Sequence, residues 1–148
     1  MKFLEKDLET IIYETPKHSL YERGLYINRN KYRQKRIGNY GIADIIAVEK
    51  TEYGEIDIQI IELKKDAIDM YTIIQVVNYA KGVSRYLEYR NSQIPVLINL
   101  ICIGRKIDND IVYMTESLRR CFFYTYSYDF DGIHFQNRSG YHLIDEGF

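Results

Sequence analysis

Three charged residues have the types and spacing that metal-assisted hydrolysis requires. Asp44 lies in one run of β-forming residues, and the next run ends with Glu62, one intervening residue and Lys64. If the two runs pair as neighbouring strands, the carboxylates come close together and their repulsion needs compensation. A divalent cation with hard oxygen ligands, Mg²⁺ or Mn²⁺, supplies it. Lys64 would then orient or stabilise a hydroxide nucleophile and offset negative charge in the transition state.

The Glu-x-Lys pattern has a plainer explanation when it is taken singly. In a chain with 28% charged residues such a pattern arises easily by chance, and a surface ion pair at a strand end has the same spacing. The chain would then be an unrelated α/β protein in which Asp44 and Glu62 do not converge. The elements that position these residues decide between the two interpretations.

The segments 41–50 and 55–65 predict a β-hairpin, because Gly54 supplies the permissive backbone that the turn between them needs. Isoleucines alternate along the second arm, and continuing that alternation places Glu62 and Lys64 on their face. One face of this strand is therefore predicted to pass from the core into a polar pocket.

Two helices are predicted on either side of this hairpin in the chain. Residues 3–14 have apolar side chains at a helical period, and Glu5 and Glu9 share one face because they lie four residues apart. Residues 70–90 form a longer amphipathic helix with Gln75 and Tyr79 one turn apart.

The remaining segments complete one α/β domain over residues 1–148, with a core of about 3–105 and a C-terminal extension over 106–148. The apolar run at 94–104 follows the long helix and predicts a buried strand in a β-α-β unit, which is usually a parallel, right-handed crossover. The other predicted elements are a strand at 24–34, a short helix at 115–121, and a terminal hairpin from the aromatic run 122–130 and residues 133–136. The alternating tyrosines at 124, 126 and 128 either stack on bases or, as we prefer, pack a sheet face or a dimer interface.

Composition indicates a globular protein without a membrane segment. The chain has 46% hydrophobic residues and a net charge of −1, so no overall field attracts it to nucleic acid. Acidic residues near the start interrupt the apolar core that a signal peptide needs. Cys102 and Cys121 are isolated, and the three histidines lack zinc-type spacing. We expect a cytoplasmic protein without a structural metal.

The positive charge is nevertheless unevenly distributed, because five cations fall within residues 29–36. Such a segment is either a solvated edge strand or a phosphate-contacting surface. Its place just before the arm that carries Asp44 favours phosphate contact. The candidate nucleic-acid-binding residues are Arg29, Lys31, Arg33, Lys35 and Arg36.

The order of these patterns resembles the PD-(D/E)XK nuclease superfamily, especially members whose following helix carries a Q-x-x-x-Y signature. These include RecB-like nuclease domains and the catalytic domains of archaeal and bacterial mismatch-specific endonucleases. The resemblance covers about residues 3–90 and depends on GIADIIAV, IIELKK and QVVNYA. The proline of the family pattern is absent, since Ala43 precedes Asp44.

The resemblance implies a restriction-endonuclease-like core, in which helices flank a central mixed β-sheet. It implies hydrolysis of phosphodiester bonds with one or two divalent metals, leaving a 5′-phosphate. Asp44, Glu62 and the Leu63 carbonyl would be the metal ligands. Lys64 would assist the nucleophile.

The helical residues receive supporting roles from the same resemblance. Gln75 and Tyr79 would face the site and steady the substrate phosphate or the catalytic lysine. Glu9, or alternatively Glu5, would supply an acid from the first helix.

We therefore expect a nuclease that depends on Mg²⁺ or Mn²⁺ and acts on DNA, with RNA as an open alternative. Cutting two strands takes two sites, so a homodimer is a further expectation, by analogy only. The rival function is a catalytically inactive nuclease-fold module that binds nucleic acid or a protein partner.

Overall fold

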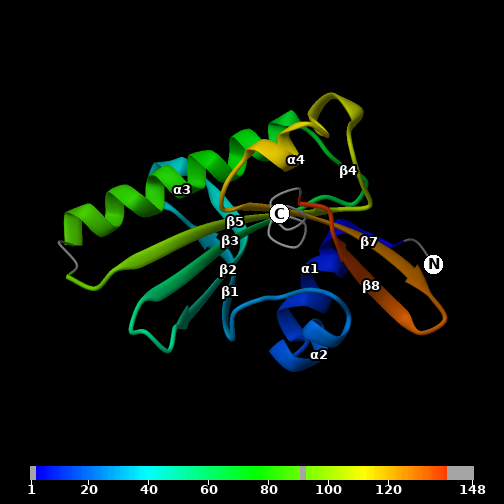
Figure 1. Cartoon of the computed structure of the whole chain (residues 1–148), viewed down its shortest axis with the longest axis horizontal. Coiled ribbons are helices and arrows are strands. Elements are labelled where there is room, and N and C mark those ends of the chain that lie inside the picture. Colours follow the sequence, from blue (N-terminus) through cyan, green and yellow to red (C-terminus); the bar gives the residue numbers. More distant parts are fainter. Residues whose placement is uncertain (1–2, 91–92, 140–148) are drawn as a thin grey trace.

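A computed structural model describes residues 3–90 and 93–139. Its main sheet has six strands in the order β1-β2-β3-β5-β7-β8 (Figure 1). Their bounds are β1 Asn30–Arg36, β2 Ile42–Lys50, β3 Ile56–Leu63, β5 Val96–Gly104, β7 Cys121–Asp129 and β8 Gly132–Asn137. A two-stranded sheet pairs β4 (Ala67–Ile68) with β6 (Lys106–Ile107). The helices are α1 Glu5–Glu14, α2 Lys17–Glu22, α3 Met70–Arg90 and α4 Met114–Ser117, with the 3₁₀ turns η1 Gly38–Tyr40 and η2 Asn109–Ile111.

The main sheet is mixed. Strands β1, β2 and β3 form an antiparallel meander, β3 pairs parallel to β5, and β5 pairs parallel to β7. The hairpin of β7 and β8 restores antiparallel pairing at the far edge. The predicted mixed α/β sheet flanked by helices is confirmed, and so is the β-α-β crossover through α3.

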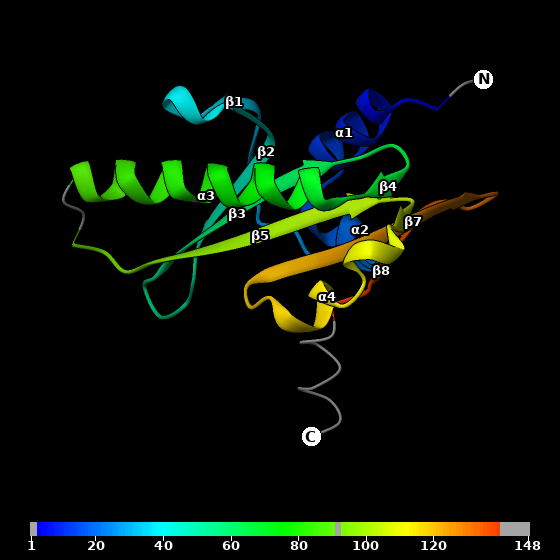
Figure 2. The ribbon, with the colours of Figure 1, turned by 90° about the horizontal axis from the view of Figure 1, so that it is seen from above.

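Helices cover both faces of the sheet. Figure 1 places α3 on one side and α1 and α2 on the other, and Figure 2 shows α3 running along the sheet. On the α3 side, Tyr79 packs with Ile60 of β3 and Ile46 of β2. On the other side, Leu8 and Ile12 of α1 pack into the larger core cluster. Burying one such Leu or Ile side chain contributes about 1.5–3 kcal/mol. The packing of α1 and α3 therefore holds each helix against its own face of the sheet.

Some local predictions were wrong. Residues Lys17–Glu22 form α2, where only the end of the first helix was expected, because Leu20 is fully buried in the larger core cluster. The strand expected from residue 24 begins at Asn30. The helix expected over 115–121 is limited to Met114–Ser117, because Cys121 already begins β7 beside β5.

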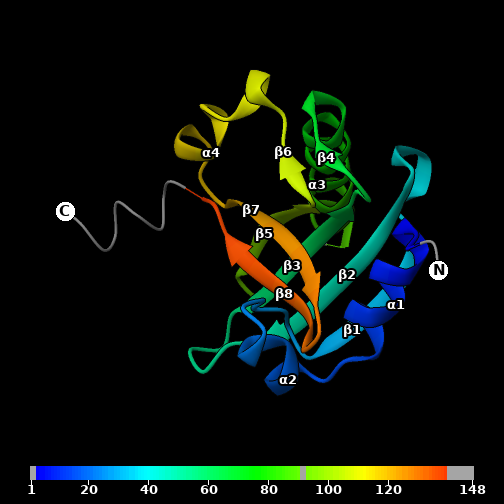
Figure 3. The same ribbon diagram turned by 90° about the vertical axis from the view of Figure 1, so that its right-hand side faces the viewer.

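The C-terminal hairpin joins the main sheet, as Figure 3 shows from the side where β7 and β8 lie in front. Tyr124 and Tyr126 are buried in the core, which confirms that they pack a sheet face, whereas Tyr128 is exposed. The part of the predicted extension over 140–148 lies outside the described residues. Within 3–90 and 93–139, no helix is long and apolar enough to cross a membrane.

Candidate active site

The two predicted metal ligands meet where the β2–β3 ladder ends. Ile45 pairs with Ile61 at its last recorded step, and the next positions in this register are Asp44 and Glu62. Oδ2 of Asp44 accepts a hydrogen bond of 2.8 Å from the backbone N–H of Leu63. The structure thus brings the two carboxyl groups together. The alternative in which Asp44 and Glu62 do not converge, and Glu62 only forms a surface ion pair, does not hold.

Burial and the neighbouring acid control the protonation of Glu62, which is only 5% exposed. Burial, followed by a hydrogen bond with Asp44 and the charge of Asp44, raises the pKa of Glu62 to about 9. The charge of Lys64 and a hydrogen bond with Tyr79 act in the opposite direction. The carboxyl pair therefore holds a proton at neutral pH unless another cation replaces it.

The donor set fits a hard divalent cation. Asp44 and Glu62 present carboxylate oxygens, the ligand type that Mg²⁺ and Mn²⁺ prefer. Oε2 of Glu62 is buried and has no hydrogen-bond partner among the described residues. A buried oxygen without a partner is costly to fold, so a cation bound to it would remove that cost.

Lys64 follows the same strand end. Its backbone N–H donates to the carbonyl of Ile103 at 2.8 Å, which fixes the chain beside β5. Its ammonium nitrogen lies 5.6 Å from the centre of the Tyr71 ring. Its charge lowers the pKa of Glu62, so the cation is within electrostatic reach of the acid pair.

The long helix α3 turns Gln75 and Tyr79 toward the same acids. Burial, the charge of Glu62 and a hydrogen bond with Glu62 raise the pKa of Tyr79 to about 12, while a hydrogen bond with Gln75 opposes that rise. Oε1 of Gln75 is buried and lacks a hydrogen-bond partner among the described residues. Tyr79 thus supports Glu62 as a neutral hydroxyl, and Gln75 leaves one polar atom unused at the site.

Two local features hold α3 in this position. At its start, Asp69 accepts from the backbone N–H of Thr72 at 2.9 Å, and the Thr72 hydroxyl lies 3.3 Å from the Asp69 N–H, a reciprocal cap. Further along, the Tyr79 ring lies against Gly41, where an added Cβ would meet Cε1 of that ring at 2.9 Å. Gly41 also has a φ of +121°, which side chains rarely adopt. The glycine before β2 therefore permits the close approach of Tyr79.

The helix α1 brings both candidate glutamates to the other side of the pair. Glu9 is buried and accepts from Arg33 at 2.8 Å and also from Gln34. Glu5 accepts from the backbone N–H of Lys65 at 3.1 Å. Both glutamates line a cavity of about 310 Å³ together with Asp44 and Leu63.

Gln34 is absent from the residues predicted for the site. It lies opposite Asp44 in the β1–β2 register, at a break between the pairs Arg33–Ile45 and Lys35–Ala43. Its φ of +50° turns the backbone there. Its amide nitrogen contacts Glu9 and lies 3.5 Å from Oδ1 of Asp44, so Gln34 joins the α1 acid to the strand acid. No periodic pattern in the sequence marks this residue, because its place depends on the break in the β1–β2 ladder.

The five candidate cations of the basic segment have different surroundings. Lys31 donates to the carbonyls of Ile12 and Thr15, which lie at the end of α1. Arg33 is the partner of Glu9, while Lys35 and Arg36 are exposed. Arg29 is also exposed, and its backbone N–H donates to Glu49, away from the acid pair.

A second group of potential ligands lies at the β7–β8 turn. Ligand atoms of Asp129, Asp131 and His134 fall within 4.8 Å of one another. The two acids are exposed, and none of the predicted metal ligands belongs to this group.

Comparisons with known proteins place the fold. No family model matches this sequence, and no curated protein matches it. A repair endonuclease from Pyrococcus abyssi superposes on it with a TM-score of 0.53 at 20% identity, covering 83% of this chain and 46% of that one. The structure of an EndoMS–dsDNA2 complex gives a TM-score of 0.43 at 16% identity over 74% of this chain and 39% of the other, too weak to support an inference. The chain spans less than half the length of either protein. The expected restriction-endonuclease-like fold, a mixed sheet flanked by helices, is therefore confirmed.

Proposed function

We propose that this restriction-endonuclease-like chain is a metal-dependent nuclease that hydrolyses phosphodiester bonds in DNA. One observation carries the proposal: the buried Glu62, with an unpartnered oxygen, meets Asp44 at a strand end beside Lys64. A protein that used these residues only for stability would not benefit from a buried acid whose pKa is about 9.

Each residue of the proposed site has a separate role in the hydrolysis. Asp44, Glu62 and the Leu63 carbonyl would hold Mg²⁺ or Mn²⁺, which, when bound, lowers the pKa of a coordinated water and neutralises charge on the phosphate. The Lys64 ammonium orients the attacking oxygen and offsets negative charge as it develops. Tyr79, which makes a hydrogen bond with Glu62, would help to orient the Glu62 carboxylate toward the bound cation.

Magnitudes explain why all of these groups are needed. Phosphodiester hydrolysis in water is so slow that an enzyme must remove on the order of 20 kcal/mol from the barrier. A single exposed carboxylate contributes a small part of this. A bound cation and the Lys64 ammonium, beside a cavity bordered by Glu9 and Gln34, would together supply much of the rest by positioning the reacting groups and offsetting charge.

DNA is the proposed substrate because the fold is shared with a repair endonuclease and the strand before the site carries exposed cations suited to phosphates. Cleavage of both strands of a duplex would involve a second copy of the chain, since one site cuts one strand. The mass of the protein in solution, alone and with DNA, tests that part of the proposal.

A substrate panel tests the function. Single-stranded, duplex and branched DNA and RNA are incubated with Mg²⁺ or Mn²⁺ and the wild type, with Glu62→Ala, and with Glu88→Ala as a matched change at an exposed glutamate. We expect metal-dependent cleavage by the wild type and by Glu88→Ala, and a loss of at least about 100-fold for Glu62→Ala. Nucleic-acid binding that survives EDTA, with no cleavage by any divalent metal, would support the inactive module instead.

A further inference from the structure

A second concave surface lies next to the proposed active site, between β1, η1 and the C-terminal half of α3. We call it the α3 groove. It has a volume of about 660 Å³. Its cationic and aromatic lining residues are Lys35, Arg36, Tyr40, Arg85, Tyr86 and Tyr89. None of the residues lining it is acidic.

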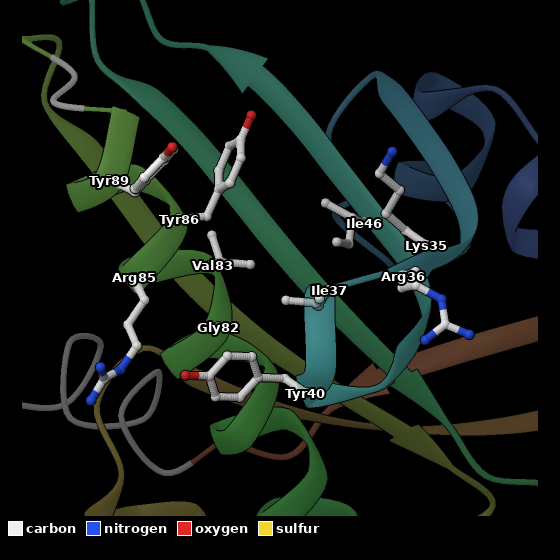
Figure 4. A pocket seen from close by; sticks show the side chains of 11 residues that line it. Lys35, Arg36, Ile37, Tyr40, Ile46, Gly82, Val83, Arg85, Tyr86 and Tyr89 are labelled. Carbon is white, nitrogen blue, oxygen red and sulfur yellow. The ribbon is translucent and has the colours of Figure 1, made fainter.

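Its walls combine aromatic rings with cations. Figure 4 shows Tyr86 and Tyr89 rising from α3 on one side, and Ile46 and Lys35 from the strands on the other. Tyr86 is 59% exposed and Tyr89 is 86% exposed, so both rings have surface open to a ligand, although the Arg90 guanidinium lies 6.0 Å from the centre of the Tyr86 ring. Arg36 and Arg85 extend outward at the rim (Figure 4).

The floor of the groove is closely packed. Gly82 of α3 lies beneath η1, and a Cβ at this position would meet Ile37 at 2.6 Å and Tyr40 at 2.7 Å. The side-chain amide of Asn78 donates to the Tyr40 carbonyl at 3.1 Å. The rings and cations therefore project from a fixed helix and a fixed sheet edge.

Residues of the α3 groove are chain neighbours of residues in the candidate active site. Lys35 and Arg36 directly follow Gln34, which contacts Glu9 and lies 3.5 Å from Asp44. On the helix side, Tyr40 precedes Gly41, which touches the Tyr79 ring. Tyr79 and Tyr86 lie seven residues apart on α3, about 10 Å along a helix, so a strand with one phosphate at the acid pair would need only a short further length to reach the groove.

We propose that the α3 groove binds an unpaired stretch of the nucleic-acid strand that the active site cleaves, with bases stacked on Tyr86 and Tyr89 and phosphates at Lys35, Arg36 and Arg85. This inference rests on the proposed nuclease function. Stacking requires bases with free faces, which a duplex does not offer, whereas rings beside cations match single-stranded ligands. The absence of acids among the lining residues favours a polyanion over a protein segment.

Binding measurements on three variants test the proposal. Fluorescence anisotropy follows labelled oligothymidine and a blunt duplex in EDTA, so that no cleavage occurs. The test variant is Tyr86→Ala/Tyr89→Ala, and the control is Tyr53→Ala/Tyr113→Ala, which changes two other exposed tyrosines. The third variant, Tyr86→Phe/Tyr89→Phe, keeps the rings and removes the hydroxyls. Thermal melting of each protein reports its folding.

If the α3 groove binds unpaired strands, the double alanine variant should lose affinity for oligothymidine and not for the duplex. The double alanine variant should bind oligothymidine at least about 25-fold more weakly, because each of its two lost stacks costs about fivefold or more. Its duplex affinity should stay within about twofold of the wild type, and the phenylalanine and control variants should bind both ligands normally. Normal oligothymidine binding by a folded double alanine variant overturns the proposal, as does an equal loss for both ligands.

A cleavage assay separates this inference from the function on which it rests. If the wild type cleaves a blunt duplex with Mn²⁺ and the double alanine variant binds single strands normally, the groove assignment fails and the nuclease stands. If the wild type cleaves nothing while the selective binding loss is observed, the nuclease fails and the groove remains a single-strand site. The proposal is also contradicted if a partner protein displaces oligothymidine from the wild type while the double alanine variant still binds oligothymidine normally.

Discussion

Replacing Glu62 with glutamine should make the metal-free protein more stable at alkaline pH, which is the reverse of the usual result for a buried site. The amide keeps the shape of the side chain and an oxygen that accepts from Tyr79. It removes the charge that the buried position disfavours, and it can donate to Asp44.

The size of the effect follows from the pKa of Glu62, which burial and Asp44 raise from 4.5 to about 9. The folded protein binds the extra proton, so stability falls as pH rises from about 4.5 to about 9. At pH 8 the ceiling is about 5 kcal/mol. Because Asp44 shares the proton and an amide also costs free energy to bury, we expect a gain of about 1–3 kcal/mol.

Thermal unfolding in EDTA measures this difference at pH 5 and pH 8. For a chain of this size the gain corresponds to a rise of about 3–10 °C in Tm at pH 8, with little change at pH 5. Glu88→Gln, on the exposed face of α3, is the control and should leave Tm unchanged at both values. Adding Mg²⁺ should raise the Tm of the wild type and not that of Glu62→Gln. A Glu62→Gln protein that is less stable than the wild type in EDTA at pH 8 would refute the reasoning.

Three further predictions concern the residues around the pair. Gly41→Ala should cost about 1–3 kcal/mol more than Gly54→Ala in urea unfolding, because both positions have positive φ but only Gly41 touches Tyr79; equal losses would show that the contact is unimportant. Tyr79→Phe should lower metal-dependent cleavage by about tenfold and leave DNA affinity unchanged, since its hydroxyl supports Glu62; unchanged cleavage would remove Tyr79 from the site. Lys31→Met should destabilise the fold by about 1–3 kcal/mol without changing DNA affinity, because its ammonium group binds two carbonyls at the end of α1. Lys35→Met should leave the stability of the fold unchanged, weaken DNA binding and reduce its salt dependence. Weaker DNA binding by Lys31→Met together with a loss of stability in Lys35→Met would contradict both assignments.

The sequence predicted those parts of the fold that depend on strong periodicity. The alternation in β3 and the helical period of α3 are long and regular, so the hairpin, the crossover and the face of Glu62 followed from them. The short helix α2 was missed, because six residues give little periodic signal and the burial of Leu20 depends on strands far along the chain.

In the site, too, the features that follow from local pattern were predicted, and those that depend on tertiary contacts were not. Asp44 and Glu62 were brought together by a hairpin register that local pattern can define. Gln34 was not among the predicted site residues, because its role depends on a backbone turn with φ +50° and on α1 packing beside β1. The basic segment looked uniform, yet Lys31 ends at a helix terminus while Lys35 reaches a groove, a difference that only tertiary contacts create.

Mn²⁺ binding measured by electron paramagnetic resonance tests most directly whether Asp44 and Glu62 hold a shared cation. At pH 8 we predict at least one bound Mn²⁺ per wild-type chain, and at least tenfold weaker binding for Asp44→Ala. Asp131→Ala, at the β7–β8 turn, should bind as the wild type does. Undiminished binding by Asp44→Ala, or its loss in Asp131→Ala alone, would contradict the account.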